Sequence, residues 1–352
     1  MRTLHRLWSA LELLPGLSSV LAEWRQLLGV EFEVSRQLLR PTRHRAEFYP
    51  CPNPGGEGCP RRVVDRGERG LVAVCGDAQG GCRDLVLTPK DLVVYELDRG
   101  RLGLLTAVAL GATPITCIPV NPLRETLRIG EYHPRAGDRF PLFLTIQPNS
   151  AQLREVAFTL LRTEPKPFIL VIPTDLFMTA DLRQMASEHK SRILPIGDII
   201  AVDAEMHNLI PTSGAAECLA AFHAEVMPDS EARKRFPTPP DTLWSQIKIR
   251  FLNRDTVTIQ CQGMVRTTTY HDAGMSDGRS GQPNKQWMLL YQMADDRGRM
   301  DIHSPHVSQL NKKRKETLCK SLHAYFGIAD DPIFWDEESS SYITRFTLEP
   351  EG

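Results

Sequence analysis

Four cysteines, Cys51, Cys59, Cys75 and Cys82, lie within 32 residues in the arrangement C-x7-C-x15-C-x6-C. Glycines precede the second and the fourth, and they allow the tight turns that let neighbouring thiolates converge. Thiolates bind Zn²⁺ with tetrahedral geometry, and a site closed by four of them is structural rather than catalytic. The spacing therefore predicts one structural zinc ion. The alternative is a set of reduced cysteines in a small β-domain.

The segment that carries these cysteines, residues 45–98, is rich in strand-forming residues and resembles a zinc ribbon. Arginines in and just before it would suit phosphates, but they alternate with acidic residues, so a solvated surface is the alternative. These arginines are Arg40, Arg43, Arg45, Arg61, Arg62, Arg66 and Arg69. The other cysteines are scattered and are expected to be buried and free: Cys117, Cys218, Cys261 and Cys319.

A second concentration of charge lies near the C-terminal end, where lysines cluster between residues 312 and 320. Residues 306–326 are predicted to form a helix because apolar residues recur every three or four positions, as at Leu318, Leu322 and Tyr325. The lysines fall on the opposite face of this helix, which is expected to be exposed.

The elements that must position this helix follow a definite order. A strand pair with its turn at 253–255 comes first, then helices near 267–273, at 284–296 and at 306–326, and finally a second strand pair. This order, with its long last helix, resembles the winged-helix domain of response-regulator-type transcription factors over residues 243–349. The resemblance rests on element order and apolar pattern rather than on an invariant motif.

The resemblance implies that residues 306–326 form a recognition helix in the major groove of duplex DNA. Amides there would read base edges, and lysines would neutralise phosphates. The implied DNA-binding residues are Gln309, Asn311, Lys312, Lys313, Lys315 and Lys320, with Arg345 on the wing. Acidic residues between 330 and 338 flank the expected wing, and they favour a protein partner over DNA at that place. A solvated helical face is the simplest alternative.

Residues 99–225 are predicted to form a Rossmann-like α/β domain, because unbroken apolar runs are typical of buried parallel strands. The predicted strands are 113–120, 126–133, 140–146, 166–173 and 191–203, and the predicted helices are 150–164 and 179–190. Ligands of such sheets bind at the carboxyl ends of strands, here near Pro173, Thr174 and Asp175 and near Asp198 and Asp203.

No dinucleotide-binding, Walker A, serine-esterase or zincin motif occurs. The central domain is therefore expected to sense a ligand or recruit a partner, and a non-enzymatic role is favoured. Asp198, Asp203, Glu205 and His207 would suit a metal-dependent nuclease site. A loop of solvated polar residues is the simpler interpretation.

The chain of 352 residues is long enough for several domains, and its net charge of −1 gives no global argument for nucleic acid. Amphipathic helices are expected over residues 3–28, divided at Pro15 and Gly16. The expected organisation is an α/β and α+β multidomain protein with a helical segment 1–44, a zinc-ribbon-like module 45–98, an α/β domain 99–225, a proline-rich linker 226–242 and a winged-helix domain 243–352.

Without a signal peptide or an apolar run of about 18 residues, the chain is expected in a reducing cytoplasm, with no membrane partner. The leading hypothesis is a DNA-binding transcriptional regulator or DNA-targeting subunit that contains structural zinc. The alternatives are a non-catalytic subunit that binds a protein partner or forms a homodimer, and a metal-dependent enzyme that acts on nucleic acid.

Overall fold

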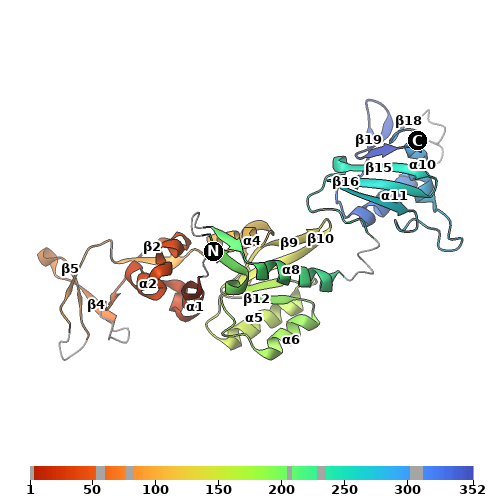
Figure 1. The fold of residues 1–352 in the computed structure, drawn as a ribbon. Coiled ribbons are helices and arrows are strands. Elements are labelled where there is room, and N and C mark those ends of the chain that lie inside the picture. The colour runs from red at the N-terminus through yellow and green to blue at the C-terminus, as the bar shows by residue number, and fades with distance from the viewer. Residues whose placement is uncertain are drawn as a thin grey trace. The chain divides into compact units, whose positions relative to one another are not determined.

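The computed structural model describes residues 4–52, 60–76, 82–203, 208–227, 235–301 and 312–351 (Figure 1). Contacts divide the chain into two compact units. The first comprises Met1–Tyr132 and Phe140–Phe222, and the second comprises His133–Arg139 and His223–Gly352. Both units combine helices with several sheets, so the chain is a mixed α/β protein, consistent with the predicted α+β multidomain class.

The N-terminal segment forms two helices that are separated at Pro15 and Gly16, which confirms the prediction. Gly16 has a φ of 67°, in the left-handed region that favours a residue without a Cβ. Trp24 is fully buried, and its Nε1 donates a hydrogen bond to the carbonyl of Tyr95 at 3.0 Å. The elements are α1 (His5–Leu13), α2 (Leu21–Leu28), α3 (Phe32–Ser35) and a sheet in the order β1 (Ser18–Val20), β7 (Val93–Leu97), β2 (Leu39–Arg45).

The four-cysteine segment forms its own antiparallel sheet, as its β-rich pattern predicted. Its strands lie in chain order: β3 (Phe48–Pro50), β4 (Pro60–Asp65), β5 (Leu71–Val74) and β6 (Leu85–Leu87). Ala73, Leu87 and Leu92 form its buried apolar cluster, with partly buried residues packed around them, and Val72 on β5 is also buried. We call these four strands and their connections the β3–β6 module.

The central sheet has the order β12-β11-β10-β9-β8, and β10, β11 and β12 run parallel. Helices α5 and α6 connect these three strands and contact each other, so the predicted β-α-β-α-β series is confirmed (Figure 1). Phe143, Leu160, Leu170 and Leu182 share the core between sheet and helices. The elements are α4 (Arg99–Ala109), β8 (Thr113–Pro119), β9 (Thr126–Arg135), β10 (Asp138–Thr145), α5 (Ser150–Thr163), β11 (Ile169–Ile172), α6 (Ala180–Glu188) and β12 (Arg192–Pro195).

The prediction of a continuous strand over residues 191–203 is wrong. After β12 the chain turns into the short helix α7 (Ile196–Ile199) and then into β13 (Ile200–Val202), which pairs with β14 (Leu209–Pro211) in a separate sheet. Ile196, Ile199 and Ile200 are all buried, so the apolar run is satisfied by a helical turn as well as by a strand. Helix α8 (Ser213–Val226) follows.

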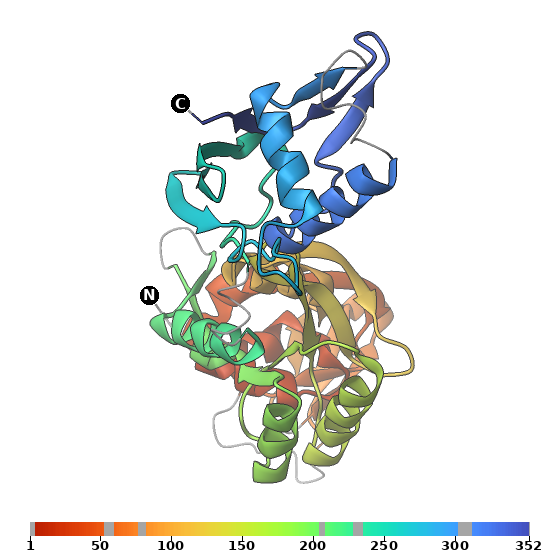
Figure 2. The ribbon, with the colours of Figure 1, turned by 90° about the vertical axis from the view of Figure 1, so that its right-hand side faces the viewer.

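The second unit contains a four-stranded sheet, a three-stranded sheet and two helices in its described part, and the helices α10 and α11 contact each other (Figure 2). The sheets have the orders β17-β16-β15-β21 and β18-β20-β19. The elements are β15 (Ile247–Asn253), β16 (Thr256–Cys261), β17 (Met264–Thr269), α10 (Lys285–Asp295), β18 (Arg299–Asp301), α11 (Lys312–Phe326), β19 (Ile333–Asp336), β20 (Ser341–Thr344) and β21 (Thr347–Glu349).

Most sequence predictions for this unit are confirmed, including the first hairpin, the helix near 284–296 and the closing hairpin. The helix predicted near 267–273 is wrong, because residues up to Thr269 belong to β17 and pair with β16. Three consecutive threonines, Thr267 to Thr269, favour a strand because they are β-branched. The predicted helix 306–326 is described from Lys312 onward, and its first part lies outside the described residues.

Residues 235–242, from the predicted linker, belong to the second unit. Phe236 is 1% exposed within its core, and its N–H donates a hydrogen bond to the carbonyl of Tyr325 at 2.9 Å. Among all described helices of the chain, none has the length and apolar content needed to cross a bilayer.

Candidate functional site

Two connections of the β3–β6 module carry the four cysteines. Cys51 directly follows β3, Cys75 directly follows β5, and Cys82 lies three residues before β6. Cys59 precedes β4 in the sequence and lies outside the described residues. In an antiparallel meander, alternate connections leave from the same end of the sheet. Both cysteine-bearing connections therefore belong to one end of the module.

The strand register brings together the two ends of each cysteine-bearing connection. Pro50 pairs with Pro60, so the residues that follow β3 and precede β4 continue from opposite positions. Ala73 pairs with Leu85, which places the chain after β5 opposite the chain before β6. The backbone thus fits the predicted pairing of Cys51 with Cys59 and of Cys75 with Cys82 around one ion.

Arg61 lies among the thiols of this module. It is 2% exposed, and its Nη2 donates a hydrogen bond to Sγ of Cys51 at 3.5 Å. This bond and the nearby thiols Cys82 and Cys75 raise the pKa of Arg61, which keeps the guanidinium charged. Its Nε is buried without a hydrogen-bond partner among the described residues. A cationic donor with unused capacity fits a cluster of thiolates, which are anionic acceptors.

The described residues by themselves do not complete a metal site. Among them, no three side chains of His, Cys, Asp or Glu form a group able to hold a metal ion. Cys51, Cys75 and Cys82 are all described and do not form such a group, and Cys59 lies outside the described residues, so the zinc assignment stays a prediction. The expectation that the other cysteines are free is confirmed, because Cys117, Cys218, Cys261 and Cys319 form no disulfide with any described residue. Cys261 and Cys319 are buried as expected, whereas Cys117 and Cys218 are half-buried.

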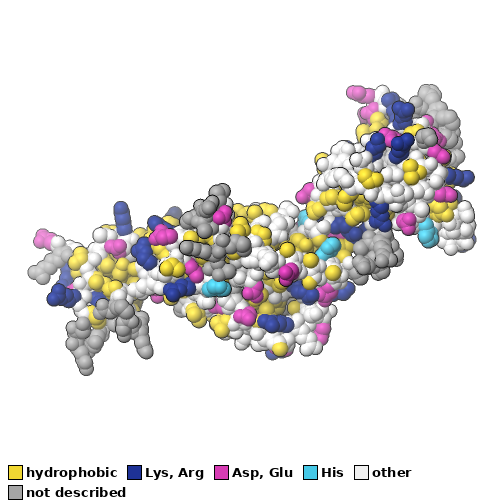
Figure 3. Space-filling model, viewed as in Figure 1, with side chains coloured by type: hydrophobic (Ala, Val, Ile, Leu, Met, Phe, Trp, Pro, Cys, Tyr) yellow, Lys and Arg dark blue, Asp and Glu magenta, His cyan; other side chains and the backbone are white. Residues whose placement is uncertain are grey.

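The arginines predicted as phosphate ligands separate into two groups. Arg61 is buried, so the prediction that it belongs to a phosphate-binding surface is wrong. Arg40 pairs with Glu96 at 2.6 Å, and Arg66 pairs with Asp84 at 2.8 Å, both at the surface. Arg43, Arg45 and Arg62 are exposed. On the face shown in Figure 3, basic and acidic side chains are interspersed, which agrees with the alternation in the sequence.

Helix α11 has the two faces that its sequence predicted. Leu318, Leu322 and Tyr325 are 0%, 1% and 3% exposed in the core of the second unit. Lys313 and Lys320, seven residues apart, are exposed on the opposite face, so they lie about 10 Å apart along the helix axis. No ion pair joins either lysine to a carboxylate of another described residue. Both ammonium groups therefore face solvent.

The other residues predicted to contact DNA are only partly described by the structure. Lys315 is half-buried on α11, and Lys312 begins the helix. Gln309 and Asn311, the amides predicted to read bases, lie outside the described residues. The basic face is thus defined by Lys313 and Lys320, with Lys315 at its edge.

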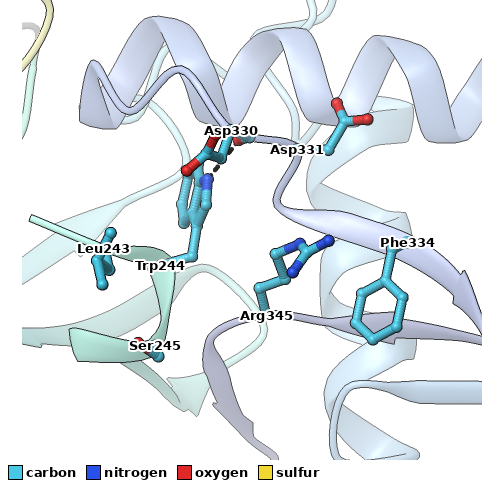
Figure 4. Close-up of a pocket in the computed structure, with 7 residues that line it drawn as sticks. All are labelled: Leu243, Trp244, Ser245, Asp330, Asp331, Phe334 and Arg345. Carbon is cyan, nitrogen blue, oxygen red and sulfur yellow. Dashed lines mark hydrogen bonds between the residues drawn. The ribbon is translucent and has the colours of Figure 1, made fainter.

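Arg345 lies at the base of the β19–β20 hairpin rather than at its tip. Its guanidinium carbon lies 4.7 Å from the centroid of the Phe334 ring, a cation–π contact that is visible in Figure 4. The side chain lines a cavity of about 580 Å³ together with Leu243, Trp244, Ser245, Asp330, Asp331 and Phe334. Asp330 and Asp331 in the same cavity place negative charge near this arginine.

The hairpin tip is acidic, as predicted for the wing. Glu337 and Glu338 are exposed, and Asp336 accepts hydrogen bonds from the hydroxyl and the backbone N–H of Ser339. These hydrogen bonds lower the pKa of Asp336. Trp335 is 44% exposed on β19 and packs against the ring of Tyr342. The tip therefore presents carboxylates next to an aromatic side chain.

The predicted ligand edge of the central sheet is contacted by the N-terminal helix. The Glu12 carboxylate accepts hydrogen bonds from the N–H of Thr174, at 3.2 Å, and from its hydroxyl; Thr174 is the second residue after β11. Burial raises the pKa of Glu12, although the hydrogen bonds from Thr174 act in the opposite direction. This carboxylate occupies hydrogen-bond donors that a ligand would otherwise use. Sequence reasoning missed it, because nothing in the pattern of α1 distinguishes Glu12 from a surface residue.

The acidic cluster predicted as an alternative metal site is only partly described. Asp198 is exposed on α7, and Asp203 is half-buried after β13 with its N–H bonded to the carbonyl of Asn208 at 2.9 Å. Glu205 and His207 lie outside the described residues.

In the comparisons with known proteins, no family model matches the chain, and no curated protein or solved structure is significantly similar to it.

Proposed function

We propose that this protein binds duplex DNA through the exposed lysine face of α11 and serves as a transcriptional regulator or DNA-targeting subunit. The observation that carries the proposal is the exposure of Lys313 and Lys320 opposite a buried apolar face. Lysines on such a helix neutralise phosphates, and this sequence-independent attraction supplies much of the affinity for DNA.

Part of the element order in the second unit supports the winged-helix resemblance, although β17 and the turn after it stand where the first of the three predicted helices was expected. The short strand β18, between α10 and α11, pairs with β20, and β20 pairs with β19 of the closing hairpin. Helix α11 then takes the place of the recognition helix, and residues 337–340 take the place of the wing tip. The strand β18, which precedes α11 in the sequence, was not predicted. Its pairing with β20 makes the closing hairpin part of a three-stranded sheet. In the same way, the parallel series β10, β11 and β12 supports the Rossmann-like proposal for the central domain.

The test is fluorescence anisotropy of a labelled duplex titrated with the full-length chain. Charge reversal in Lys313→Glu/Lys320→Glu is expected to weaken binding by about tenfold or more for each lysine, because each loses a charge-assisted contact to phosphate. The binding should also fall steeply as salt rises.

A matched control changes the same net charge away from α11. Lys166 and Lys190 are exposed in the first unit, so Lys166→Glu/Lys190→Glu carries the same total charge as the test variant. The control is expected to bind DNA within about twofold of the wild type, because salt screens exposed charges that make no contact with phosphate. Equal affinity of all three proteins would refute the proposed role of α11.

A protein-binding role is the second candidate, and the acidic hairpin favours it. Glu337 and Glu338 would repel a phosphate backbone, whereas exposed Trp335 beside them suits a basic protein surface. In this case the Lys313→Glu/Lys320→Glu variant keeps any partner binding, and Trp335→Ala loses it. Absence of DNA binding by the wild type, together with a complex that depends on Trp335, would establish this candidate instead.

For the β3–β6 module we propose a zinc-ribbon-like structure with one structural zinc ion bound by Cys51, Cys59, Cys75 and Cys82. The shared end of the sheet and the small apolar core support this proposal. Modules of this size usually need a metal, disulfides or a partner for stability. Zinc would supply cross-linking of the two connections and no catalysis.

Elemental analysis of the purified full-length protein tests the zinc proposal. About one ion per chain is expected, and Cys51→Ser should release it. Cys218, a half-buried cysteine on α8, provides the control, because Cys218→Ser should retain the metal. A zinc-free wild type with unchanged stability would contradict the proposal.

A further inference from the structure

Strand β4 places a positive charge inside the β3–β6 module. Arg61 is buried, whereas Pro60 and Arg62 on either side of it are exposed. Because side chains alternate along a strand, Arg61 and Val63 share the inner face, and Val63 packs against the apolar core. Arg61 therefore holds a position where an apolar side chain would be expected. A buried guanidinium is costly unless anionic or polar groups surround it.

The guanidinium contacts the chain beside three of the four cysteines. Nη1 donates to the carbonyl of Arg83, next to Cys82, at 2.7 Å, and it lies 3.5 Å from the carbonyl of Ala73, two residues before Cys75. Nη2 donates to Sγ of Cys51 itself at 3.5 Å. One planar side chain thus joins the end of β3, the end of β5 and the approach to β6.

The acidic partner of Arg61 among the described residues is a thiol rather than a carboxylate. Asp84, the carboxylate adjacent to Arg83, pairs instead with Arg66 at 2.8 Å. A thiolate is the anionic form of cysteine and accepts hydrogen bonds from a guanidinium. The hydrogen bond from Arg61 to Sγ of Cys51 is therefore one that a metal-bound thiolate would accept.

Four thiolates around Zn²⁺ carry a net charge of about −2, which is costly to hold at the end of a small, partly buried sheet. We propose that Arg61 compensates part of this charge, and that its fork holds the two cysteine-bearing connections in place, so that it raises the affinity of the module for zinc. The proposal rests on the zinc site proposed above. Arg61 acts as a positioning residue, because a protonated guanidinium has no lone pair with which to bind the metal.

The experiment measures the zinc affinity of the full-length protein by competition with a chromophoric chelator. Arg61→Gln keeps some hydrogen bonding but removes the charge, and it is expected to weaken zinc binding by about 10- to 100-fold. Arg61→Lys should recover part of that loss, because it restores the charge without the planar fork. Arg62→Gln, a change at the exposed neighbour on the same strand, should bind zinc as the wild type does.

Substitution of Co²⁺ supplies a second readout, because absorption by thiolate-bound cobalt reports the number of cysteine ligands. The expected result is the same four-thiolate spectrum in wild type and Arg61→Gln, at different metal affinities. A wild type that binds neither metal refutes the zinc site itself. A wild type that binds zinc, with Arg61→Gln as tight as Arg62→Gln, refutes only the role of Arg61. If Arg61→Gln is insoluble, the zinc affinity of Arg61→Lys is the deciding measurement. A zinc affinity equal to that of the wild type would refute the role of the planar guanidinium of Arg61.

Discussion

The β3–β6 module and the second unit differ in how their interiors are built. In the described residues, the buried apolar cluster of the module contains three residues, whereas that of the second unit contains 25, including Trp244, Trp287 and Phe251. The largest buried side chain of the module is Arg61, whereas the largest buried side chains of the second unit are aromatic. Hydrophobic burial stabilises roughly in proportion to area. The second unit is therefore expected to fold by packing alone, and the module is expected to depend on its metal.

The largest expected effect is the response of the module to loss of zinc. Removal of the metal from the full-length chain by a chelator should abolish hydrogen-exchange protection in β3 to β6, because structural zinc supplies about 10 kcal/mol or more in comparable peptides. Strands β15 and β16 should keep their protection. Mass spectrometry of the exchanged peptides reports both regions in one sample. Equal loss in both, or in neither, would break the comparison.

Next in size is the loss of a core aromatic side chain from the second unit. Trp287 is 1% exposed, packs edge-on against Phe251, and donates from Nε1 to the carbonyl of Arg254 at 2.8 Å. Trp287→Ala should cost about 3 to 5 kcal/mol because it leaves a cavity and an unpaired carbonyl. The denaturant midpoint for exchange in β15 and β16 measures this loss. Trp335→Ala, at a position that is 44% exposed, is the control and should cost much less.

A smaller effect on stability, but a large one on binding, is expected for the basic face of α11. Lys313→Glu/Lys320→Glu should change the free energy of unfolding of the second unit by no more than about 0.5 kcal/mol for each lysine, because both side chains are exposed. Denaturation of the same preparation that is used for the anisotropy titration checks this directly. Unfolding of the variant at much lower denaturant would mean that the lysines belong to the fold.

The smallest expected effect is the pH response of the hairpin tip. Hydrogen bonds from Ser339 lower the pKa of Asp336 below its ordinary value of 3.8. Its contribution to the hairpin is therefore present above the ordinary pKa and is lost as pH falls through the lower, folded value. The NMR shift of the Ser339 amide should titrate below pH 3.8, and Asp336→Asn should remove this titration. A midpoint above 3.8 would contradict the hydrogen bonds at this site.

The sequence predicted correctly those helices and strands whose hydrophobic pattern fits only one kind of secondary structure. The amphipathic face of α11 and the apolar runs of β10 and β11 were found because periods near 3.6 and 2 residues, or unbroken apolar stretches, point to one environment. The pattern failed at residues 196–199, where the same apolar run also satisfies a helical turn, and at β17, where threonines were placed in a helix. Short apolar runs fit either structure, and tertiary pairing decides between them.

The candidate site was predictable only in part, for a related reason. Cysteine spacing marks the metal ligands because few other residues bind zinc. Arg61 was assigned to the surface, since an arginine between charged residues gives no sign of burial until the strand register is known. Glu12 likewise became identifiable only through Thr174, which lies far from it in the sequence. Such partners are set by folding rather than by local pattern.

The most direct test of the role of α11 is the slope of log K for duplex DNA against log salt concentration, measured with the wild type and with Lys313→Ala/Lys320→Ala. Each lysine that contacts a phosphate contributes about 1 to this slope through release of bound counterions. The variant is therefore predicted to have a slope shallower by about 2, together with weaker binding at every salt concentration. Identical slopes for the two proteins would contradict DNA binding through this helix.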